Sequence, residues 1–284
     1  MSIDEVQEEL PYNENNIIIS PDDLSNLLTT YGIKLKYCDI NIYRQSFVHK
    51  SYCTRKNDNC INGNLHCLNN CIPLQETSNE RLEFLGDAIL SCVIANYLYD
   101  RYSAENEGFL TKMRTKIVNG TMLAYLSEKV NLDKHVIISK QIENNEGRKN
   151  KNILEDTFEA FIGAIFIDFN NKGINSKKMP ELSGIGFQMA QVWIINVIEK
   201  FIDFPELIIN NKNYKDTLIK YYQHNFQSIL KFQELDVEIK NNKKTFVVSV
   251  KNNKDAVLGI GKGESKKKAE QNASLEALKY LGQI

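Results

Sequence analysis

The chain of 284 residues is long enough to bury one large core and to add a second, smaller domain. Hydrophobic residues make up 42% and charged residues 25%, an ordinary balance for a globular protein that excludes a strongly biased composition. The net charge is −1, but residues 212–284 hold 14 lysines, no arginine and 8 acidic residues, a local charge of +6. A basic C-terminal region on an acidic body indicates a polyanionic partner.

The sequence carries no targeting or membrane signal. No run of 18 apolar residues occurs, so we expect no membrane partner. The N-terminus is acidic and lacks the pattern of a signal peptide, so secretion is not expected. We therefore expect a cytoplasmic protein in a reducing, intracellular environment.

The six cysteines are then expected to be reduced thiols. Some of them lie beside His66 in an asparagine-rich stretch, namely Cys53, Cys60, Cys67 and Cys71. A zinc site would usually show closely paired ligands, and no C-x-x-C pair is present. The stretch is better explained as a loop with incidental cysteines than as a zinc site.

The first two thirds of the sequence predict an all-α domain over residues 21–204. Residues 1–20 are acidic and asparagine-rich and are expected to be loose. Apolar periodicity and capping residues predict helices over 21–31, 41–51, 80–101, 108–118, 120–129, 152–168 and 185–202. Residues 53–78 and 169–184 are predicted as insertions or loops.

The last part of the sequence, residues 212–284, predicts a small α+β domain. Residues 214–225 have a helical pattern, and a final helix is predicted over 265–281. Between them, apolar and polar residues alternate in short stretches that predict strands at 235–239, 244–250 and 256–260. The predicted order is α-β-β-β-α.

Acidic residues occur in two of the most apolar predicted helices. In N-E-R-L-E-F-L-G-D, Glu80, Glu83 and Asp87 are spaced i, i+3 and i+7, which places them on one helix face. In the second helix, Asp156 and Glu159 are spaced i and i+3. The rest of both helices is almost entirely apolar, so these carboxylates are expected to be largely buried.

A cation would remove the energetic cost of this arrangement. One buried unpaired carboxylate costs several kcal/mol, and converging carboxylates repel one another. Oxygen ligands suit Mg²⁺, and two such ions would balance four carboxylates. The alternative is a solvated acidic face, or acids that favour a helix start. Because the pattern occurs twice, each time among apolar residues, we favour a metal site. Gly86 and Gly163 would let the two helices pack closely beside it.

The last predicted helix opens with Ser265 followed by Lys266, Lys267 and Lys268. Lysines in a first turn oppose the helix dipole by roughly 0.3–1 kcal/mol each. A bound phosphate reverses this effect, because the helix N-terminus and the ammonium groups attract the same anion. We therefore predict a phosphate-binding site there, with a solvated face as the alternative.

Taken together, these segments resemble the ribonuclease III family. N-E-R-L-E-F-L-G-D (79–87) is similar to the family signature, and 47–52, 106–119 and 146–168 resemble its other blocks in the same order. The C-terminal region resembles a double-stranded-RNA-binding domain. The resemblance covers about 21–282.

The resemblance implies an Mg²⁺-dependent endoribonuclease that cuts double-stranded RNA as a homodimer and leaves 3′ overhangs and 5′ phosphates. Mn²⁺ would be able to replace Mg²⁺. By family motif, the metal ligands would be Glu83, Asp87, Asp156 and Glu159, with Asp87 and Glu159 the catalytic pair.

The resemblance implies lesser roles for other residues. Glu80 and Glu107 would be accessory acids, and the lysines at 266–268 would bind RNA. Phe84 matches the dimer contact, although a place in the core of its own chain is equally compatible with the sequence.

The sequence also departs from the family pattern. The turn at 240–243 lacks a Gly-Pro-x-His-type reach into a minor groove, and Ile219 and Lys220 replace a polar pair. These departures predict a weaker affinity for RNA. The alternative function is a catalytically weak or inactive protein that binds and sequesters double-stranded RNA. The presence of all four core acids favours the enzyme. The Asn-, Lys- and Ile-rich composition fits an AT-rich genome, and if that genome is viral the expected location is the host cytoplasm.

Overall fold

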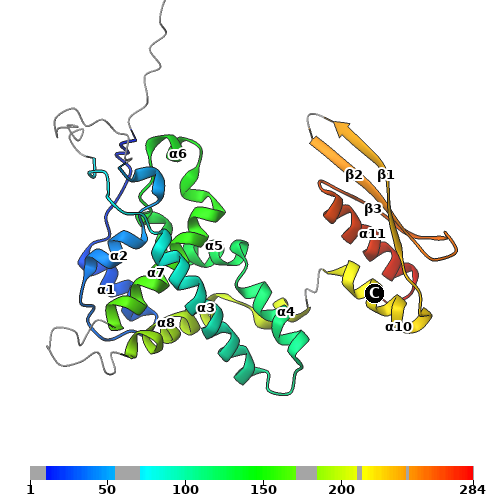
Figure 1. The fold of residues 1–284 in the computed structure, drawn as a ribbon, viewed down its shortest axis with the longest axis horizontal. Coiled ribbons are helices and arrows are strands. Elements are labelled where there is room, and N and C mark those ends of the chain that lie inside the picture. Colours follow the sequence, from blue (N-terminus) through cyan, green and yellow to red (C-terminus); the bar gives the residue numbers. More distant parts are fainter. Residues whose placement is uncertain (1–10, 55–70, 171–183, 210–212, 241–242, 284) are drawn as a thin grey trace, which may run out of the picture. The chain divides into compact units, whose positions relative to one another are not determined.

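The computed structural model describes residues 11–54, 71–170, 184–209, 213–240 and 243–283. The chain divides into two compact units, Met1–Asp203 and Phe204–Ile284 (Figure 1). Each unit has its own core and is described by itself.

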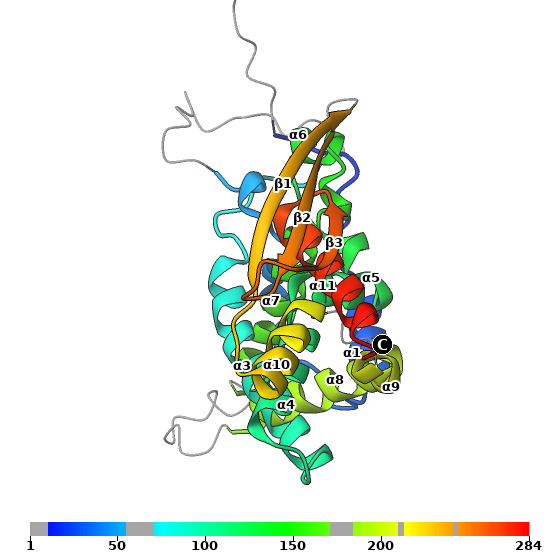
Figure 2. The ribbon, with the colours of Figure 1, turned by 90° about the vertical axis from the view of Figure 1, so that its right-hand side faces the viewer.

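In its described residues, the first unit is helical. Its α-helices are α1 (Pro21–Thr30), α2 (Ile40–Ser46), α3 (Glu80–Arg101), α4 (Glu107–Ile117), α5 (Gly120–Lys129), α6 (Lys140–Asn144), α7 (Lys151–Asn170) and α8 (Ile185–Phe201). Short 3-10 turns are η1 (Lys50–Tyr52), η2 (Leu132–His135) and η3 (Gly147–Lys149). The helices α3 and α7 lie against each other at the centre of the unit (Figures 1 and 2).

The helix α7 forms the middle of the core. Phe158 and Phe161 are fully buried, and the ring of Trp193 from α8 lies 5.4 Å and 5.2 Å from theirs. Aromatic side chains of this size contribute much of the apolar area that a core removes from water. They fix α7, and therefore any polar group on it, in one position.

Two glycines allow α3 and α7 to touch through their backbones, as the sequence predicted. A Cβ atom at Gly86 would lie 1.8 Å from the carbonyl oxygen of Glu159, and one at Gly163 would lie 2.3 Å from the carbonyl oxygen of Leu82. Both distances are shorter than any real contact of a Cβ atom. The crossing therefore requires glycine at both positions, and it lies beside the predicted acids.

By length and apolar composition, α3 is the one helix in the described part of the chain that could cross a membrane. Such a match is weak support for a membrane span, because the core helix of a folded domain passes the same test. In this structure α3 buries residues such as Leu90, Val93 and Ile94 inside the unit.

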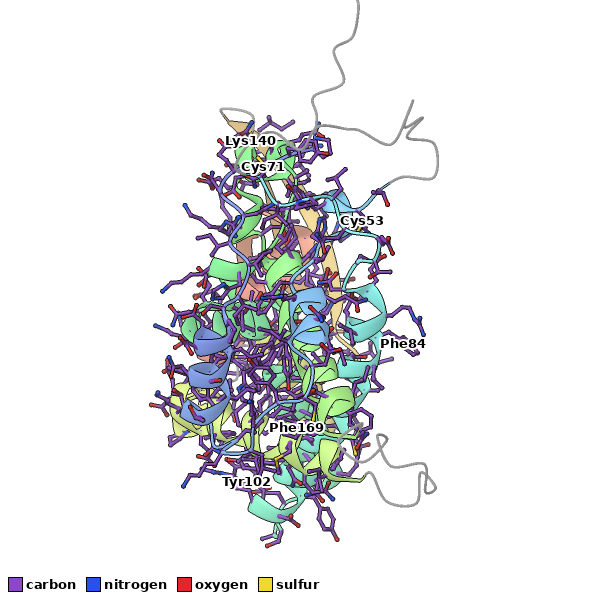
Figure 3. All side chains as sticks on the ribbon, turned by 90° about the vertical axis from the view of Figure 1, so that its left-hand side faces the viewer. Cys53, Cys71, Phe84, Tyr102, Lys140 and Phe169 are labelled. Atoms are coloured by element: carbon purple, nitrogen blue, oxygen red, sulfur yellow. The ribbon has the colours of Figure 1, made fainter. Side chains whose placement is uncertain are left out.

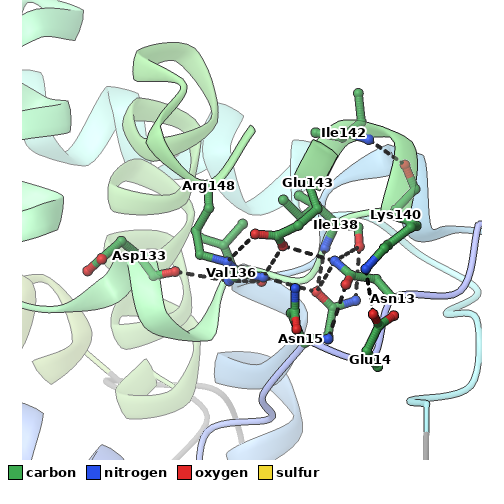
Figure 4. Close-up of polar contacts among 12 residues, drawn as sticks. Asn13, Glu14, Asn15, Asp133, Val136, Ile138, Lys140, Ile142, Glu143 and Arg148 are labelled. Atoms are coloured by element: carbon green, nitrogen blue, oxygen red, sulfur yellow. Dashed lines mark hydrogen bonds and ion pairs between the residues drawn. The ribbon is translucent and has the colours of Figure 1, made fainter. Parts of the chain in front are cut away.

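Residues 11–20 correct one prediction, because they pack on the unit instead of being loose. The Nδ2 atom of Asn13 donates hydrogen bonds to the Ile138 carbonyl oxygen at 3.1 Å and to Glu143 at 2.9 Å (Figure 4). Asn16 also donates to the Ile138 carbonyl oxygen and accepts from the Ile138 N–H. These polar side chains can be buried because they form hydrogen bonds with backbone groups that are far away in the sequence. Local sequence does not reveal such partners. Residues 1–10 lie outside the described residues.

The helix predicted over 41–51 is also corrected, because it breaks after Ser46. The backbone of Val48 accepts a hydrogen bond from Asn79 N–H at 2.8 Å and pairs in a short parallel bridge with Ile137. Backbone groups used in this way are not available for a helix, so the chain extends until η1.

The structure describes part of the predicted insertion 53–78, and this part packs against the rest of the first unit. Cys53 and Cys71 contact a hydrophobic cluster that includes Tyr52, and the Tyr52 hydroxyl donates to the Ile72 carbonyl oxygen at 2.7 Å (Figure 3 labels both cysteines). Cys60, Cys67 and His66 lie outside the described residues, as do residues 171–183 of the second predicted loop.

The second unit has the predicted α-β-β-β-α order after a short additional helix. Its elements are α9 (Phe204–Ile209), α10 (Tyr214–Phe226), β1 (Lys231–Lys240), β2 (Lys243–Lys251), β3 (Val257–Gly263) and α11 (Lys266–Tyr280). The strands form an antiparallel sheet in the order β1-β2-β3. The helix α11 packs on the sheet, and a Cβ atom at Gly261 of β3 would lie only 2.1 Å from the Ala273 nitrogen of that helix. Glycine therefore permits this close helix–sheet contact.

Candidate active site

The structure brings the four predicted metal acids together where α3 and α7 cross. Glu83 and Asp87 project from α3, and Asp156 and Glu159 project from α7. Glu159 is buried, with 8% of its surface exposed, whereas Glu83 and Asp156 are half-buried and Asp87 is exposed. The site is therefore desolvated on one side and open to solvent on the other.

Burial and mutual repulsion raise the pKa values of Glu83, Asp156 and Glu159. Burial raises the pKa of Glu159 to about 8, and the negative charges of Asp87 and Glu155 add to the effect. Burial and then the charge of Glu155 raise the pKa of Asp156 to about 6. The pKa of Glu83 is raised by burial and by the charge of Asp156. Each of these pKa shifts includes the charge of a neighbouring acid, which indicates that the carboxylates interact electrostatically as one cluster.

Within the described residues, the acids of the cluster lack protein partners, in contrast to another acid of α7. The Asp168 carboxylate is fully buried and accepts hydrogen bonds from the backbone N–H groups of Cys38 and Asp39 and from the Tyr43 hydroxyl. No hydrogen bond or ion pair to another described residue is formed by the side chains of Glu83, Asp87, Glu155, Asp156 and Glu159. No hydrogen bond or ion pair within the described residues therefore offsets their negative charge, as expected for ligands of a cation.

Glu155 belongs to this cluster, although the sequence did not single it out as a site residue. It is half-buried, and its pKa is raised by burial and by the charges of Glu83 and Asp87. A signal was present, because Glu155 and Glu159 are spaced i and i+4, which places them on one face of a helix.

Glu80 lies at the edge of the site in a different environment. Its carboxylate accepts hydrogen bonds from the Ser78 hydroxyl at 3.0 Å and from Lys50 Nζ at 3.3 Å, and these bonds lower its pKa. The positive charge of Lys50 opposes part of the rise in the pKa values of Glu83 and Asp156. Lys50 is thus a cation that faces the acids within the chain. A cavity of about 350 Å³ opens beside them and is lined by residues that include His49, Lys50, Glu80 and Asp156.

Glu107 is not brought to the cluster within one chain. It lies exposed in the first turn of α4 and accepts a hydrogen bond from the Thr111 hydroxyl at 2.8 Å. Its charge is not among those that shift the pKa values of the clustered acids.

Phe84 is the most exposed large apolar side chain in the described residues, with 82% of its surface accessible (Figure 3). This exposure excludes a place in the core of its own chain. Ala88 and Cys92, one and two turns further along α3, are also exposed. Together the three residues form an apolar strip on the outer face of the helix, which is defined here as the α3 strip.

The acids fit a hard divalent cation by their chemistry. Each offers carboxylate oxygens, which Mg²⁺ prefers, and no donor from another described residue engages those oxygens. Among the described residues, no three acidic, histidine or cysteine side chains already converge as ligands of one ion. Mutual repulsion explains this spread, because without a cation nothing draws like charges together.

The three predicted RNA-binding lysines open α11, as the sequence indicated. Ser265 caps this helix by accepting a hydrogen bond from the Lys268 N–H at 3.2 Å. All three lysine side chains are exposed, and Lys266 Nζ lies 3.5 Å from Glu234. A cavity of about 610 Å³ beside them is lined by Lys215, Lys266 and Lys267 and also by the acids Asp216 and Glu270. Positive charge and a helix N-terminus therefore meet at one surface of the second unit.

Comparison with known proteins agrees with both units. A Ribonuclease-III-like family model matches residues 39–178, and a Double-stranded RNA binding motif matches residues 214–281. A probable ribonuclease 3 of Acanthamoeba polyphaga mimivirus is 32% identical over 95% of this chain, which spans about half (48%) of the length of that relative. Ribonuclease 3 of Leptospira interrogans is 31% identical over 86% of this chain and 85% of its own.

A solved structure is also similar in sequence. The nuclease domain of ribonuclease III from Campylobacter jejuni shares 30% identity and covers 64% of this chain and 99% of its own, with a TM-score of 0.46. With a helical nuclease unit, a C-terminal unit of the double-stranded-RNA-binding type and a relative at 31% identity along most of both lengths, the chain belongs to the ribonuclease III family.

Proposed function

We propose that this ribonuclease III family member is an endoribonuclease that hydrolyses double-stranded RNA with two Mg²⁺ ions held by Glu83, Asp87, Asp156 and Glu159. One observation carries the proposal. Five carboxylates gather at a rigid helix crossing, most of them at least half-buried and none with a partner among the described residues, where only a cation would balance their charge.

The protein supplies position and charge to the reaction. When bound, the metal ions activate a water molecule and stabilise the oxygen that leaves the phosphorus atom. Glu159, buried against α3, gives up its proton to become a ligand, while the exposed Asp87 faces the side from which a phosphodiester can arrive. The glycine crossing keeps α3 and α7 at a fixed spacing, so the two helices that carry the acids are held in place before RNA binds. Mn²⁺ has the same charge and ligand preference and would be able to replace Mg²⁺.

The second unit supports the substrate class. The lysines at 266–268 and the N-terminus of α11 would bind backbone phosphates, and domains of this type recognise the shape of an A-form duplex. We therefore propose double-stranded RNA as the substrate, held by the second unit and cut by the first.

A homodimer would complete the enzyme. The α3 strip, Phe84 with Ala88 and Cys92, is an exposed apolar surface on the same helix that carries Glu83 and Asp87. If the strips of two chains pair about a twofold axis, the dimer has two acid sites, one for each RNA strand. Two offset cuts would then give 3′ overhangs and 5′ phosphates.

Incubation of a long RNA duplex with the purified protein tests the proposal. We expect shortening of the duplex with Mg²⁺, none with a chelator, and none for a single-stranded RNA of the same length. Retardation of the duplex in a gel without any cleavage would instead favour the alternative, a binding protein that sequesters RNA.

A further inference from the structure

We propose that the cavity beside the acids is a ribose subsite, in which Asn79 and His49 recognise the 2′-hydroxyl group of a nucleotide next to the cut. The inference rests on the proposed function, since it names the part of the RNA substrate that lies beside the proposed metal site.

The cavity, of about 350 Å³, adjoins the proposed metal site. Its lining includes Asp156, a proposed metal ligand, and Asn152, which precedes Asp156 by one turn on the same face of α7. Asn79 and Glu80, at the start of α3, also line it. An RNA strand whose phosphate reached a metal ion at Asp156 would therefore bring a neighbouring sugar within reach of this cavity.

Asn79 lines the cavity and keeps an unused hydrogen-bond acceptor. Its side chain is buried, with 3% of the residue exposed, and its Nδ2 atom donates to the Ser46 carbonyl oxygen at 3.4 Å. Because a carbonyl oxygen can only accept, this contact fixes which amide atom is the nitrogen. The Oδ1 atom forms no hydrogen bond with a described residue and does not cap α3. A buried acceptor of this kind is available to a donor from a ligand.

His49 supplies a donor to the same cavity. The backbone N–H of Ser51 donates to His49 Nδ1 at 3.2 Å, so Nδ1 carries no proton and the ring proton is on Nε2. The Nε2–H group forms no hydrogen bond with a described residue. A cavity that offers one acceptor and one donor matches a hydroxyl group, which donates one hydrogen bond and accepts another.

The rest of the lining favours a neutral sugar over a phosphate group. Lys50 and Glu80 pair at 3.3 Å and offset each other, and a phosphate would also meet the negative charge of Asp156. Ile142 and Ile153 add apolar surface against which a sugar ring can pack. The 2′-hydroxyl is the sugar group that distinguishes RNA from DNA, so this subsite would help to select RNA at the point of cleavage.

A structural role for Asn79 is the competing explanation. Its hydrogen bond to Ser46 joins the start of α3 to the end of α2, and its loss would lower the stability of the fold. That role would slow the cleavage of every duplex to the same extent. An effect that depends on one sugar of the substrate therefore separates the two explanations.

The direct test is single-turnover cleavage, by the full chain with Mg²⁺, of RNA duplexes in which one 2′-hydroxyl near the cut is replaced by fluorine. A 2′-fluoro sugar keeps the A-form duplex but cannot donate a hydrogen bond. In the wild type, fluorine at one position should slow cleavage by roughly tenfold, because a buried acceptor is left without its donor. Equal rates for the unmodified duplex and for all fluorinated duplexes would overturn the inference.

Variants connect that effect to the two residues. Asn79→Ala should cut the unmodified duplex more slowly, and fluorine at the sensitive position should then add little, because the acceptor is already gone. His49→Asn keeps an oxygen that can accept from Ser51 but lacks Nε2, so it should also reduce the difference between the two duplexes. If Asn79→Ala does not fold, His49→Asn alone decides.

Asn196→Ala is the matched control. Asn196 also donates to a backbone carbonyl oxygen, that of Tyr31 at 3.3 Å, but it does not line this cavity. This variant should keep the full, roughly tenfold difference between the unmodified and fluorinated duplexes. The same full difference in Asn79→Ala and His49→Asn would contradict the assignment of the subsite.

The outcomes also separate this inference from the proposed function. If the wild type does not cut the unmodified RNA duplex, the proposed function fails and the ribose subsite fails with it. If the wild type cuts that duplex but no single fluorine changes the rate, the endonuclease assignment stands and only the role of the cavity is wrong.

Discussion

Glu159 and Asp168 are two buried acids on the same helix with opposite energetics. Asp168 accepts hydrogen bonds from two backbone N–H groups and a tyrosine hydroxyl, so its burial is compensated. Glu159 has no such partners among the described residues and is surrounded by other acids. The first carboxylate therefore holds the fold together, whereas the second weakens it unless a cation binds.

This difference predicts opposite effects of neutralising the two residues. In a chelator, Asp168→Asn should lower the free energy of unfolding by about 1–3 kcal/mol, because buried donors are deprived of a charged acceptor. Glu159→Gln should leave it unchanged or raise it, since a repelled charge is removed. Urea unfolding measures both variants. Equal decreases in stability would show that Glu159 is a structural residue.

The raised pKa values predict how stability depends on pH. A carboxyl group with a higher pKa in the folded protein holds its proton there while the unfolded chain has released it. Without metal, stability should therefore fall as the pH rises from about 4.5, the ordinary carboxyl value, towards about 8, the pKa of Glu159. Urea unfolding at pH 5.5 and pH 8.0 in a chelator measures this fall, which should be smaller in Glu159→Gln.

Mg²⁺ should reverse that trend, because the ion binds the deprotonated acids and competes with protons. A saturating concentration should raise the thermal midpoint by several degrees at pH 8 and by less at pH 6. Scanning calorimetry with and without Mg²⁺ tests this. A stabilisation that is larger at pH 6 would contradict the assignment of these acids as ligands.

At the scale of elements, the crossing of α3 and α7 determines the spacing of the acids. Backbone atoms of Glu159 and Leu82 occupy the places where side chains at Gly86 and Gly163 would lie. These neighbours are backbone atoms in a packed core and have little freedom to move. The geometry of the site is therefore sensitive to a single methyl group at either position.

Gly86→Ala or Gly163→Ala should accordingly lower the free energy of unfolding by about 1–3 kcal/mol or more. Cleavage should fall as well, because the acids would be pushed apart. Gly184→Ala is a matched control, since Gly184 is exposed and a Cβ atom there would meet nothing within 4 Å. A wild-type unfolding curve for Gly86→Ala would disprove the close crossing.

The start of α11 is the second element with a specific prediction. Lys266→Ala/Lys267→Ala should weaken binding to duplex RNA and reduce the dependence of log Kd on log salt by roughly one for each phosphate that the chain no longer neutralises. Lys279→Ala is the control, because Lys279 lies in the last turn of α11 and pairs with Glu276 at 2.8 Å. Binding measured at several salt concentrations decides the matter, and an unchanged slope in the double variant would exclude phosphate binding by these lysines.

These elements also show how far the sequence predicts the structure. The long periodic helices α3 and α7 and the order of the second unit followed from residue patterns, because burial of apolar side chains determines them locally. The packing of residues 11–20 and the break after Ser46 did not, because hydrogen bonds to Ile138 and Ile137 cause them from far along the chain. The pattern also gave Asp156 and Glu159. Glu155 was not singled out, although its spacing of four residues from Glu159 places both on one helix face.

At the scale of the whole molecule, we propose that the first unit carries out the chemistry and the second binds the RNA. The first carries uncompensated negative charge at a helix crossing, and the second carries exposed lysines at a helix N-terminus. An acidic cluster alone would repel RNA, so the proposed mechanism requires both a metal ion at the acids and a basic surface that binds the RNA backbone. This division explains why the near-neutral net charge of the chain conceals two strongly charged surfaces.

The most direct test of the account is single-turnover cleavage of a duplex RNA by Asp87→Asn and Glu159→Gln, with protein in excess and Mg²⁺ present. Both variants should bind the duplex as the wild type does, while cleavage falls by at least about a hundredfold, as expected when a ligand of catalytic metal ions is removed. Glu105→Gln, an exposed acid outside the cluster, should cut normally. Cleavage by Asp87→Asn and Glu159→Gln at the wild-type rate would contradict the account.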